Sequence, residues 1–414
     1  MRFLKDLRSV LNFTVIIAGL GYFVDLFDIT LFGVVRVTSL KDLGITDPAL
    51  ITSHGVSIYN AQMIGMMIGG IIWGTLGDKR GRLSVMMWSI LLYSLANIAN
   101  AFVWNVEGYI LLRFLGGLGL AGELGAAITL VAESLPKEKR GLGTTIVAML
   151  GMLGILAAAK LGQWIPWRYA YALGGVMGLT LLAMRFKIRE SSLFEKPSAG
   201  GNRGNIFLLF KGRRFFKYLA CILIGVPVYF TTGVLFTFAP ELTSGLNVQG
   251  TVTAGDAILY GSMGLAIGDL LSGLFSQWLK SRRYAIALML AAGATLMWIY
   301  INLPGLTSGM VYFMSFAIGL CVGYWAVLVT MAAEQFGTNI RATVATTVPN
   351  FVRGSAIFAI TGFNWLLHPP SGAPGYSAAT SALIIGSICF SVAILCVLLI
   401  GETFTRDLDY TEGA

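Results

Sequence analysis

The chain has 414 residues, of which 56% are hydrophobic and 12% are charged, and its formal net charge is +9. Soluble domains carry about 25% charged residues, so this composition excludes an ordinary water-soluble globule. A net positive charge can indicate a nucleic-acid partner, but the basic residues lie where a membrane protein needs them, and no nucleic acid is expected.

Long apolar segments recur along the whole chain. A helix needs about 20 apolar residues to cross the hydrocarbon core of a bilayer. The segments are too long for barrel strands, which alternate in polarity over about ten residues. We therefore predict an all-α membrane protein with twelve transmembrane helices. They cover residues 13–36, 56–77, 83–103, 107–133, 141–163, 166–186, 215–240, 254–279, 283–303, 307–333, 343–367 and 375–400.

Lys and Arg residues cluster at the amino terminus and after every second predicted helix, most densely at 185–217. Because Lys and Arg are enriched in cytoplasmic loops, this pattern predicts that both termini are cytoplasmic. A segment at 187–214 contains Pro, Ser and Gly and forms the predicted linker. It separates an amino-terminal six-helix bundle, 1–186, from a carboxy-terminal one, 215–400, and residues 401–414 form a cytoplasmic tail.

The two halves resemble each other. A glutamate followed seven residues later by an arginine occurs twice, at an offset of 201 residues: Glu133 with Arg140, and Glu334 with Arg341. The same offset carries the basic loop Gly77–Arg82 onto Trp278–Arg283, where Leu279 replaces Asp78. The chain should therefore consist of two parallel six-helix repeats, an arrangement found in many transporters.

Several motifs carry a family resemblance. They are Gly77-Asp78-Lys79-Arg80-Gly81-Arg82, Arg113-Phe114-Leu115-Gly116-Gly117-Leu118-Gly119 with Gly122-Glu123, Glu133 with Arg140-Gly141, and Glu334-Gln335-Phe336-Gly337-Thr338-Asn339-Ile340-Arg341. The chain resembles the major facilitator superfamily over its whole length, with motifs similar to the metabolite:proton symporter, sugar-porter and organic-ion branches. The resemblance implies alternating access around a central cavity lined by the first, fourth, seventh and tenth helices.

Ionisable side chains are costly at membrane depth and should face a partner or a wet cavity. Those inside the predicted helices are Asp25, Asp28, Arg113, Glu123, Lys160, Asp269 and Arg353. Asp28 and Arg113 lie roughly 12 and 9 Å from the outer ends of their predicted helices, so we expect them to pair. Protonation of Asp28 would then release Arg113, and the sugar-porter resemblance implies a coupling Asp and Arg at these two positions. Asp25 and Glu123 form a second acidic locus. The alternative is a static structural ion pair.

The offset of 201 maps Asp28 to Tyr229, Arg113 to Met314 and Glu123 to Tyr324. The second half therefore lacks the titrating groups, which suggests that the first half handles protons and the second half recognises substrate. The predicted substrate site comprises Arg353, Asn350, Tyr229, Tyr324, Trp325, Lys160 and Asp269. Arg353 and Asp269 could instead neutralise each other.

The cytoplasmic loops form a separate constellation. Asp78 can lie at a helix amino terminus, where the helix dipole favours an anion. Several loop charges can form ion pairs between helices and close the cytoplasmic side. The predicted gate consists of Asp78, Arg82, Glu133, Arg140, Glu334 and Arg341.

These observations predict a proton-coupled symporter that imports a small polar, anionic metabolite across the cell inner membrane by alternating access. Its partners would be the substrate, protons and the bilayer, and it would act as a monomer. No motif supports an enzyme, and no cofactor or metal is expected, since the four cysteines lack metal-binding spacing. One alternative is a proton-driven antiporter exporting amphipathic or cationic compounds. Another is a non-transporting membrane receptor.

Overall fold

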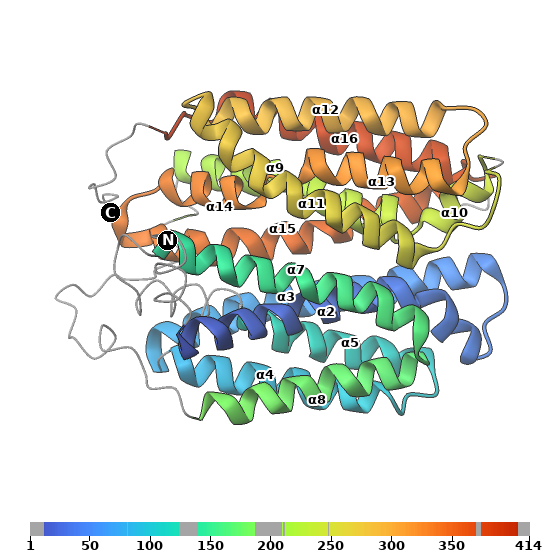
Figure 1. Ribbon diagram of the computed structural model, residues 1–414, viewed down its shortest axis with the longest axis horizontal. Helices are drawn as coiled ribbons and strands as arrows, with labels where there is room; N and C mark the ends of the chain where they lie inside the picture. Colours follow the sequence, from blue (N-terminus) through green and yellow to red (C-terminus); the bar gives the residue numbers. More distant parts are fainter. Residues whose placement is uncertain are drawn as a thin grey trace, which may run out of the picture. The chain divides into compact units, whose positions relative to one another are not determined.

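In the computed structural model, the described residues are 12–80, 82–123, 140–186, 209, 212–246, 248–369 and 374–404. Helices account for most of them, and a single bridge between Gln249 and Thr307 joins two loops. The chain divides into two compact units (Figure 1). The first unit comprises Met1–Gly44 and Ser57–Gly201, and the second comprises Ile45–Val56 and Asn202–Ala414.

The first unit is a bundle in which α2 packs on α7 and α8, and α4 packs on α5 and α8. The helices from the first half of the chain are α2 Phe13–Asp42, α3 Pro48–Arg80, α4 Arg82–Asn100, α5 Val106–Leu120, α7 Arg140–Trp164 and α8 Trp167–Arg185. Polar side chains start two of them. Asn12 accepts a hydrogen bond from the Val15 amide, and Asn105 accepts one from the Gly108 amide, each at 2.8 Å.

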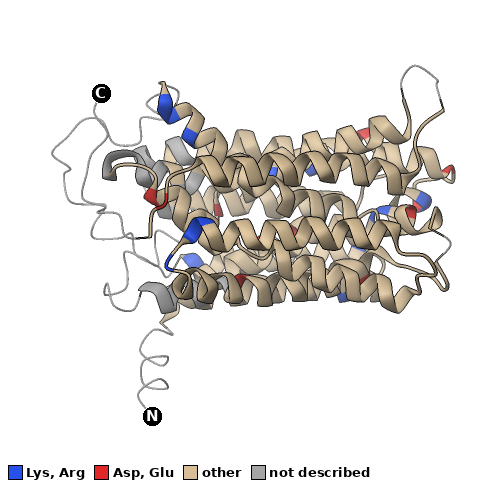
Figure 2. Ribbon diagram, turned by 90° about the horizontal axis from the view of Figure 1, so that it is seen from above, with Lys and Arg blue, Asp and Glu red and all other residues tan. Residues whose placement is uncertain are grey.

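The second unit pairs α11 with α13, α9 with α15 and α16, and α12 with α16. Its elements are α9 Arg213–Phe230, the π-helix η3 Thr231–Phe236, α10 Ala239–Ser244, α11 Ala254–Trp278, α12 Arg282–Asn302, α13 Ser308–Val322, α14 Trp325–Glu334, α15 Thr338–Leu367 and α16 Ala378–Leu399. Charged side chains lie mostly towards helix ends, while the middle stretches are largely uncharged (Figure 2).

Each segment that the sequence predicts to be a membrane span contains a helix among the described residues, although residues 124–133 of the fourth segment lie outside them. Among the described residues, seven helices are long and apolar enough to cross a bilayer by length and composition. They are Phe13–Asp42, Pro48–Trp73, Arg213–Phe236, Ala254–Trp278, Arg282–Asn302, Ser308–Glu334 and Ala378–Leu399. The count of twelve spans and the cytoplasmic termini stay predictions.

Several predicted helices differ from the observed ones; the second, for example, begins at Pro48 rather than at residue 56. Three of the differences have a physical cause in the structure. The first continues to Asp42, because Arg36 is buried within the bundle and does not mark the helix end. The predicted helix 215–240 changes from α to π after Phe230, three residues beyond Pro227, whose missing N–H weakens the α ladder. The predicted helix 307–333 is interrupted between Val322 and Trp325.

In each unit, two helices cross so closely that glycines lie against carbonyl oxygens of the other helix. The contacts are Gly65 with Phe114 O, Gly69 with Leu118 O and Gly117 with Gln62 O, then Gly264 with Phe316 O, Gly268 with Leu320 O and Gly319 with Gly261 O. The second set repeats the first at an offset of 199 residues from α3 to α11, and of 202 from α5 to α13.

These local offsets correct the single value of 201. The counterpart of Arg113 becomes Ser315 instead of Met314, and the counterpart of Glu123 becomes Trp325 instead of Tyr324. The uniform offset does not hold here because the chain between the paired crossings is longer in the second half, with 52 residues from Gly264 to Phe316 (316 − 264) against 49 from Gly65 to Phe114 (114 − 65). The second half still carries no acid or arginine at these two positions.

Candidate functional site

A buried ion pair joins α2 to α5 at the midpoint of α2. Arg113 Nη1 lies 3.0 Å from Asp28 Oδ1, and the two side chains are 0% and 1% exposed. Arg113 Nη2 also donates to the Asp28 carbonyl oxygen at 3.2 Å. A third helix contributes Gln62, whose Nε2 donates to Asp28 Oδ2 at 3.1 Å. The predicted pairing of Asp28 with Arg113 is confirmed. The predicted depth of Asp28 was too small, because the helix continues to Asp42 rather than ending at residue 36.

Aromatic rings surround the other side of Arg113. Its guanidinium carbon lies 5.3 Å from the ring centre of Tyr171 and 6.0 Å from that of Phe32. Such cation–π contacts add an attraction of about 2 kcal/mol for a desolvated guanidinium, in addition to the ion pair. The hydroxyls of Tyr109 and Tyr171 are 2.8 Å apart, which fixes the rings. Arg113 is therefore held by Asp28 on one side and by aromatic rings on the other.

A second buried ion pair binds Glu123 in a way that the sequence did not predict. Arg185 Nη2 and Nη1 donate to Glu123 Oε2 and Oε1 at 2.6 and 2.9 Å. Ser89 Oγ donates to Oε1 at 3.0 Å, and both charged side chains are buried. A Cβ added at Gly21 of α2 would lie 2.5 Å from Arg185 Nη2. Arg185 is thus an internal residue of the bundle rather than a residue of the basic linker.

The remaining first-half candidates are placed separately. Asp25 is buried in α2 one turn before Asp28, so the two carboxyl groups share one helix face. Lys160 lies in α7 and is partly exposed. Glu123 of the predicted second acidic locus forms an ion pair with Arg185, and a shared role of Glu123 and Asp25 stays a prediction.

In the second unit, three of the predicted substrate residues meet. Arg353 is 1% exposed, and its Nε donates to the Tyr229 hydroxyl at 3.2 Å. The ring of Trp325 meets that of Tyr229 edge-on, with 5.8 Å between ring centres. The helices α15, α9 and α14 thus bring together a cation, a phenol and an indole.

The other second-half candidates take different roles. The Tyr324 hydroxyl donates to Ile224 O at 2.8 Å, which directs this ring into the packing against α9. Asn350 is buried in α15, one turn before Arg353. Asp269 Oδ1 accepts the backbone N–H of Ala326 at 2.8 Å. Asp269 and Arg353 are therefore engaged by different groups, and the predicted mutual neutralisation is not observed between them.

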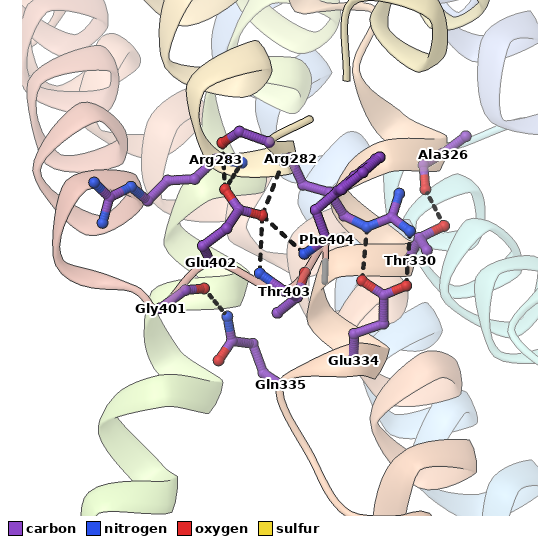
Figure 3. Close-up of polar contacts among 11 residues, drawn as sticks. Arg282, Arg283, Ala326, Thr330, Glu334, Gln335, Gly401, Glu402, Thr403 and Phe404 are labelled. Atoms are coloured by element: carbon purple, nitrogen blue, oxygen red, sulfur yellow. Dashed lines mark hydrogen bonds and ion pairs between the residues drawn. The ribbon is translucent and has the colours of Figure 1, made fainter. Parts of the chain in front are cut away.

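A polar cluster joins the α11–α12 turn, the end of α14 and the chain after α16 (Figure 3). Arg282 forms a two-pronged ion pair with Glu334, with N–O distances of 2.6 and 2.7 Å. Glu402 accepts the backbone N–H groups of Arg282 at 3.1 Å and Arg283 at 3.3 Å, and also the Ser281 hydroxyl. Although partial burial opposes it, these hydrogen bonds, with others from the Thr403 and Phe404 amides, hold the pKa of Glu402 below its ordinary value.

Most of the predicted gate falls outside the described part of the structure. Glu133 lies between described segments, and the side chains of Asp78, Arg82, Arg140 and Arg341 are likewise not described. Glu334 is the exception, and its partner is Arg282 within the same unit.

Sequence reasoning missed five residues of these networks: Gln62, Ser89, Arg185, Arg282 and Glu402. Two of them had a usable signal. Arg185 lies inside the predicted helix 166–186, and the offset of 201 aligns Arg82 with Arg283, next to the observed partner of Glu334. Gln62 and Ser89 gave none, because an uncharged polar residue in an apolar helix often bonds to its own backbone.

Packed apolar helices with charges buried inside each bundle define a multi-pass integral membrane protein. The chain matches the Major Facilitator Superfamily over residues 18–365 and belongs to it, as its motifs predict. It is 27% identical over 367 residues to the niacin transporter NiaP of Acinetobacter baylyi, covering 79% of this chain and 80% of the relative.

A second relative is the 4-hydroxybenzoate transporter PcaK of Acinetobacter baylyi, 25% identical over 418 residues, with 87% of this chain and 88% of the relative covered. The crystal structure of a D-xylose-proton symporter has a TM-score of 0.70 at 17% identity and covers 94% of this chain and 98% of that one. The last likeness shows the fold, and the family with its named relatives makes this protein a transporter of small molecules.

Proposed function

We propose that this transporter is a proton-coupled symporter that imports a small ring-containing carboxylate across the cell inner membrane. Its twelve helices would form two parallel six-helix repeats with both termini cytoplasmic. The distribution of Lys and Arg supports this topology, and the recurring glycine–carbonyl contacts support the repeat. The observation that carries the proposal is the division of buried charge between the units.

Asp28 and Arg113 form the proton-coupling pair in this proposal. The Asp28 carboxylate binds side chains from α3 and α5 at the same time. A proton on Asp28 removes the charge that both donors stabilise, so proton binding changes the relative stability of two arrangements of the bundle. Asp25, one turn away, is proposed as an auxiliary acid. Glu123 remains a predicted coupling residue, although its two-pronged bond to Arg185 favours a structural role.

Arg353, Tyr229 and Trp325 form the proposed substrate-binding set. A guanidinium can bind a carboxylate through two parallel hydrogen bonds, and an indole provides a flat apolar surface for a ring. Niacin and 4-hydroxybenzoate, which the names of the two relatives give as their substrates, each combine a carboxylate with an aromatic ring. Asn350, one turn before Arg353 in α15, completes the proposed set as a polar group, and Lys160 of the first unit stays a predicted substrate residue.

Removal of the Arg353 charge tests this assignment. We expect Arg353→Gln to weaken binding of niacin or 4-hydroxybenzoate by more than tenfold, or about 1.4 kcal/mol, because the carboxylate loses its cation. Equilibrium binding of radiolabelled compound to purified protein measures it. Arg168→Gln is the control, since Arg168 pairs with Asp42 elsewhere, at an N–O distance of 3.4 Å. Unchanged binding to Arg353→Gln, together with binding of organic cations, would favour the antiporter instead.

A further inference from the structure

The tenth predicted helix is broken inside the second unit. Helix α13 ends at Val322, and α14 begins at Trp325 after Gly323 and Tyr324. The Tyr324 amide donates to Val322 O at 3.0 Å, so the chain turns there rather than continuing the α ladder. A new helix start exposes N–H groups that need acceptors, and a bilayer supplies no water for them.

The acceptor comes from another helix. Asp269 of α11 places Oδ1 2.8 Å from the amide nitrogen of Ala326, the second residue of α14. A capping side chain normally belongs to the residue just before the helix and bonds to the second or third amide. Tyr324 occupies that position, but its hydroxyl donates to Ile224 O. The Asp269 carboxylate also matches the partial positive charge at the start of α14.

Backbone packing holds the break against the same point of α11. A Cβ added at Gly323 would lie 2.4 Å from Leu265 O and 2.8 Å from the Asp269 nitrogen. Only a glycine therefore fits between the turn and α11. The turn and its capping carboxylate are thus fixed together by one short stretch of α11.

The capped end carries part of the proposed binding set. Trp325 is the first residue of α14, its ring contacts that of Tyr229, and Tyr229 accepts a hydrogen bond from Arg353. We propose that Asp269 is a positioning residue that fixes the start of α14 and thereby sets Trp325 against Tyr229 and Arg353. This inference rests on the proposed function, which assigns substrate recognition to those three residues. It replaces the direct substrate contact that the sequence predicts for Asp269.

Two substitutions of Asp269 distinguish its capping role from the role of its negative charge. Asn caps a helix about as well as Asp, whereas Ala cannot cap, so Asp269→Asn should bind radiolabelled niacin or 4-hydroxybenzoate within about threefold of wild type. Asp269→Ala should bind roughly tenfold more weakly. Adding Asp269→Ala to Trp325→Ala should weaken binding little further, because the two residues act through one contact. Asp256→Ala, on the same helix but at its start, is the matched control.

A second readout does not depend on the ligand. Hydrogen–deuterium exchange of the amides of 325–328 should accelerate several-fold in Asp269→Ala and remain near wild type in Asp269→Asn, because an uncapped helix end frays. Peptides from α16 should exchange at the same rate in all variants, which shows that the fold is intact.

The outcomes distinguish this inference from the proposed function. Wild-type binding and wild-type exchange in Asp269→Ala would overturn the positioning role. An equal loss of binding in Asn and Ala with unchanged exchange would also overturn it, and would assign Asp269 to substrate or proton directly. If Arg353→Gln and Trp325→Ala bind normally, or wild type binds neither compound, the proposed substrate site fails. The exchange experiment then still decides whether Asp269 caps α14.

Discussion

Each buried acid of the first unit that forms an ion pair is held by groups from more than one helix. Asp28 bonds to Arg113 and Gln62, and Glu123 bonds to Arg185 and Ser89. A charge buried with a single partner seldom recovers its desolvation cost, and the extra donors supply hydrogen bonds that it needs. The Asp28 carboxylate accepts two hydrogen bonds from side chains and the Glu123 carboxylate accepts three, so the Asp28 contacts can be broken at the loss of fewer bonds.

Glu402 gives a pH-dependent prediction at the residue scale. Its folded-state pKa lies below the ordinary value of 4.5, so its contribution to stability is present above that value and is lost as pH falls through the folded-state pKa. We expect Glu402→Gln to lower the thermal unfolding temperature at pH 7 and to differ less from wild type as the pH falls below about 4.5. Thermal unfolding in detergent between pH 3.5 and 7 measures it. A difference independent of pH would contradict the assignment.

Some of the site residues and their pairings could be predicted from the sequence. Charges inside apolar segments are visible in the sequence, so Asp28, Arg113 and Arg353 were found, and the pairing of the first two follows from the cost of burying a charge together with their similar depths. The partner of Glu123 was missed because Arg185 precedes a basic linker and resembles part of it. The role of Asp269 needs the path of another helix, since it bonds to a backbone amide rather than to a charge.

At the element scale, close helix crossings depend on glycines whose positions recur in both units. A Cβ at Gly264 would lie 2.0 Å from Phe316 O, whereas one at Gly273 of the same helix would meet open space. We expect Gly264→Ala to destabilise the protein by about 1–3 kcal/mol through overpacking. Gly273→Ala should be neutral or slightly stabilising, because Ala favours helix. Unfolding of both variants in detergent checks the contrast, and equal stability would show that α11 and α13 can separate without cost.

Helix existence was predictable at this scale, but helix continuity was not. Apolar length locates the segments well, because the bilayer fixes the length that a span needs. The π-helix after Pro227 and the turn at Gly323 have apolar residues on both sides, so a hydropathy profile does not detect these interruptions of the helix. Such interruptions are tolerated where neighbouring helices supply the missing hydrogen bonds, and those neighbours are not visible in the sequence.

At the scale of the whole molecule, the repeats share packing but not chemistry. By the corrected offsets, the second-half counterpart of Arg113 is Ser315 and that of Gln62 is Gly261. Ser315 donates to the Val311 carbonyl within its own helix at 2.9 Å, so the second unit has no equivalent of the Asp28 network at these positions. The second unit instead carries Arg353 with its aromatic neighbours. This asymmetry supports the proposal that proton coupling and substrate recognition lie in different halves.

The most direct test of the central claim compares two transport modes of Asp28→Asn in proteoliposomes. Wild type should accumulate radiolabelled niacin or 4-hydroxybenzoate only with an imposed proton gradient. Asp28→Asn should lose accumulation and keep counterflow exchange, because a permanently neutral side chain cannot couple a proton but still permits alternating access. Asp42→Asn is the matched control on the same helix. Asp42 accepts a hydrogen bond from Trp167 Nε1 at 3.1 Å and takes no part in the pair of Asp28 and Arg113. Undiminished gradient-driven accumulation by Asp28→Asn would contradict the account.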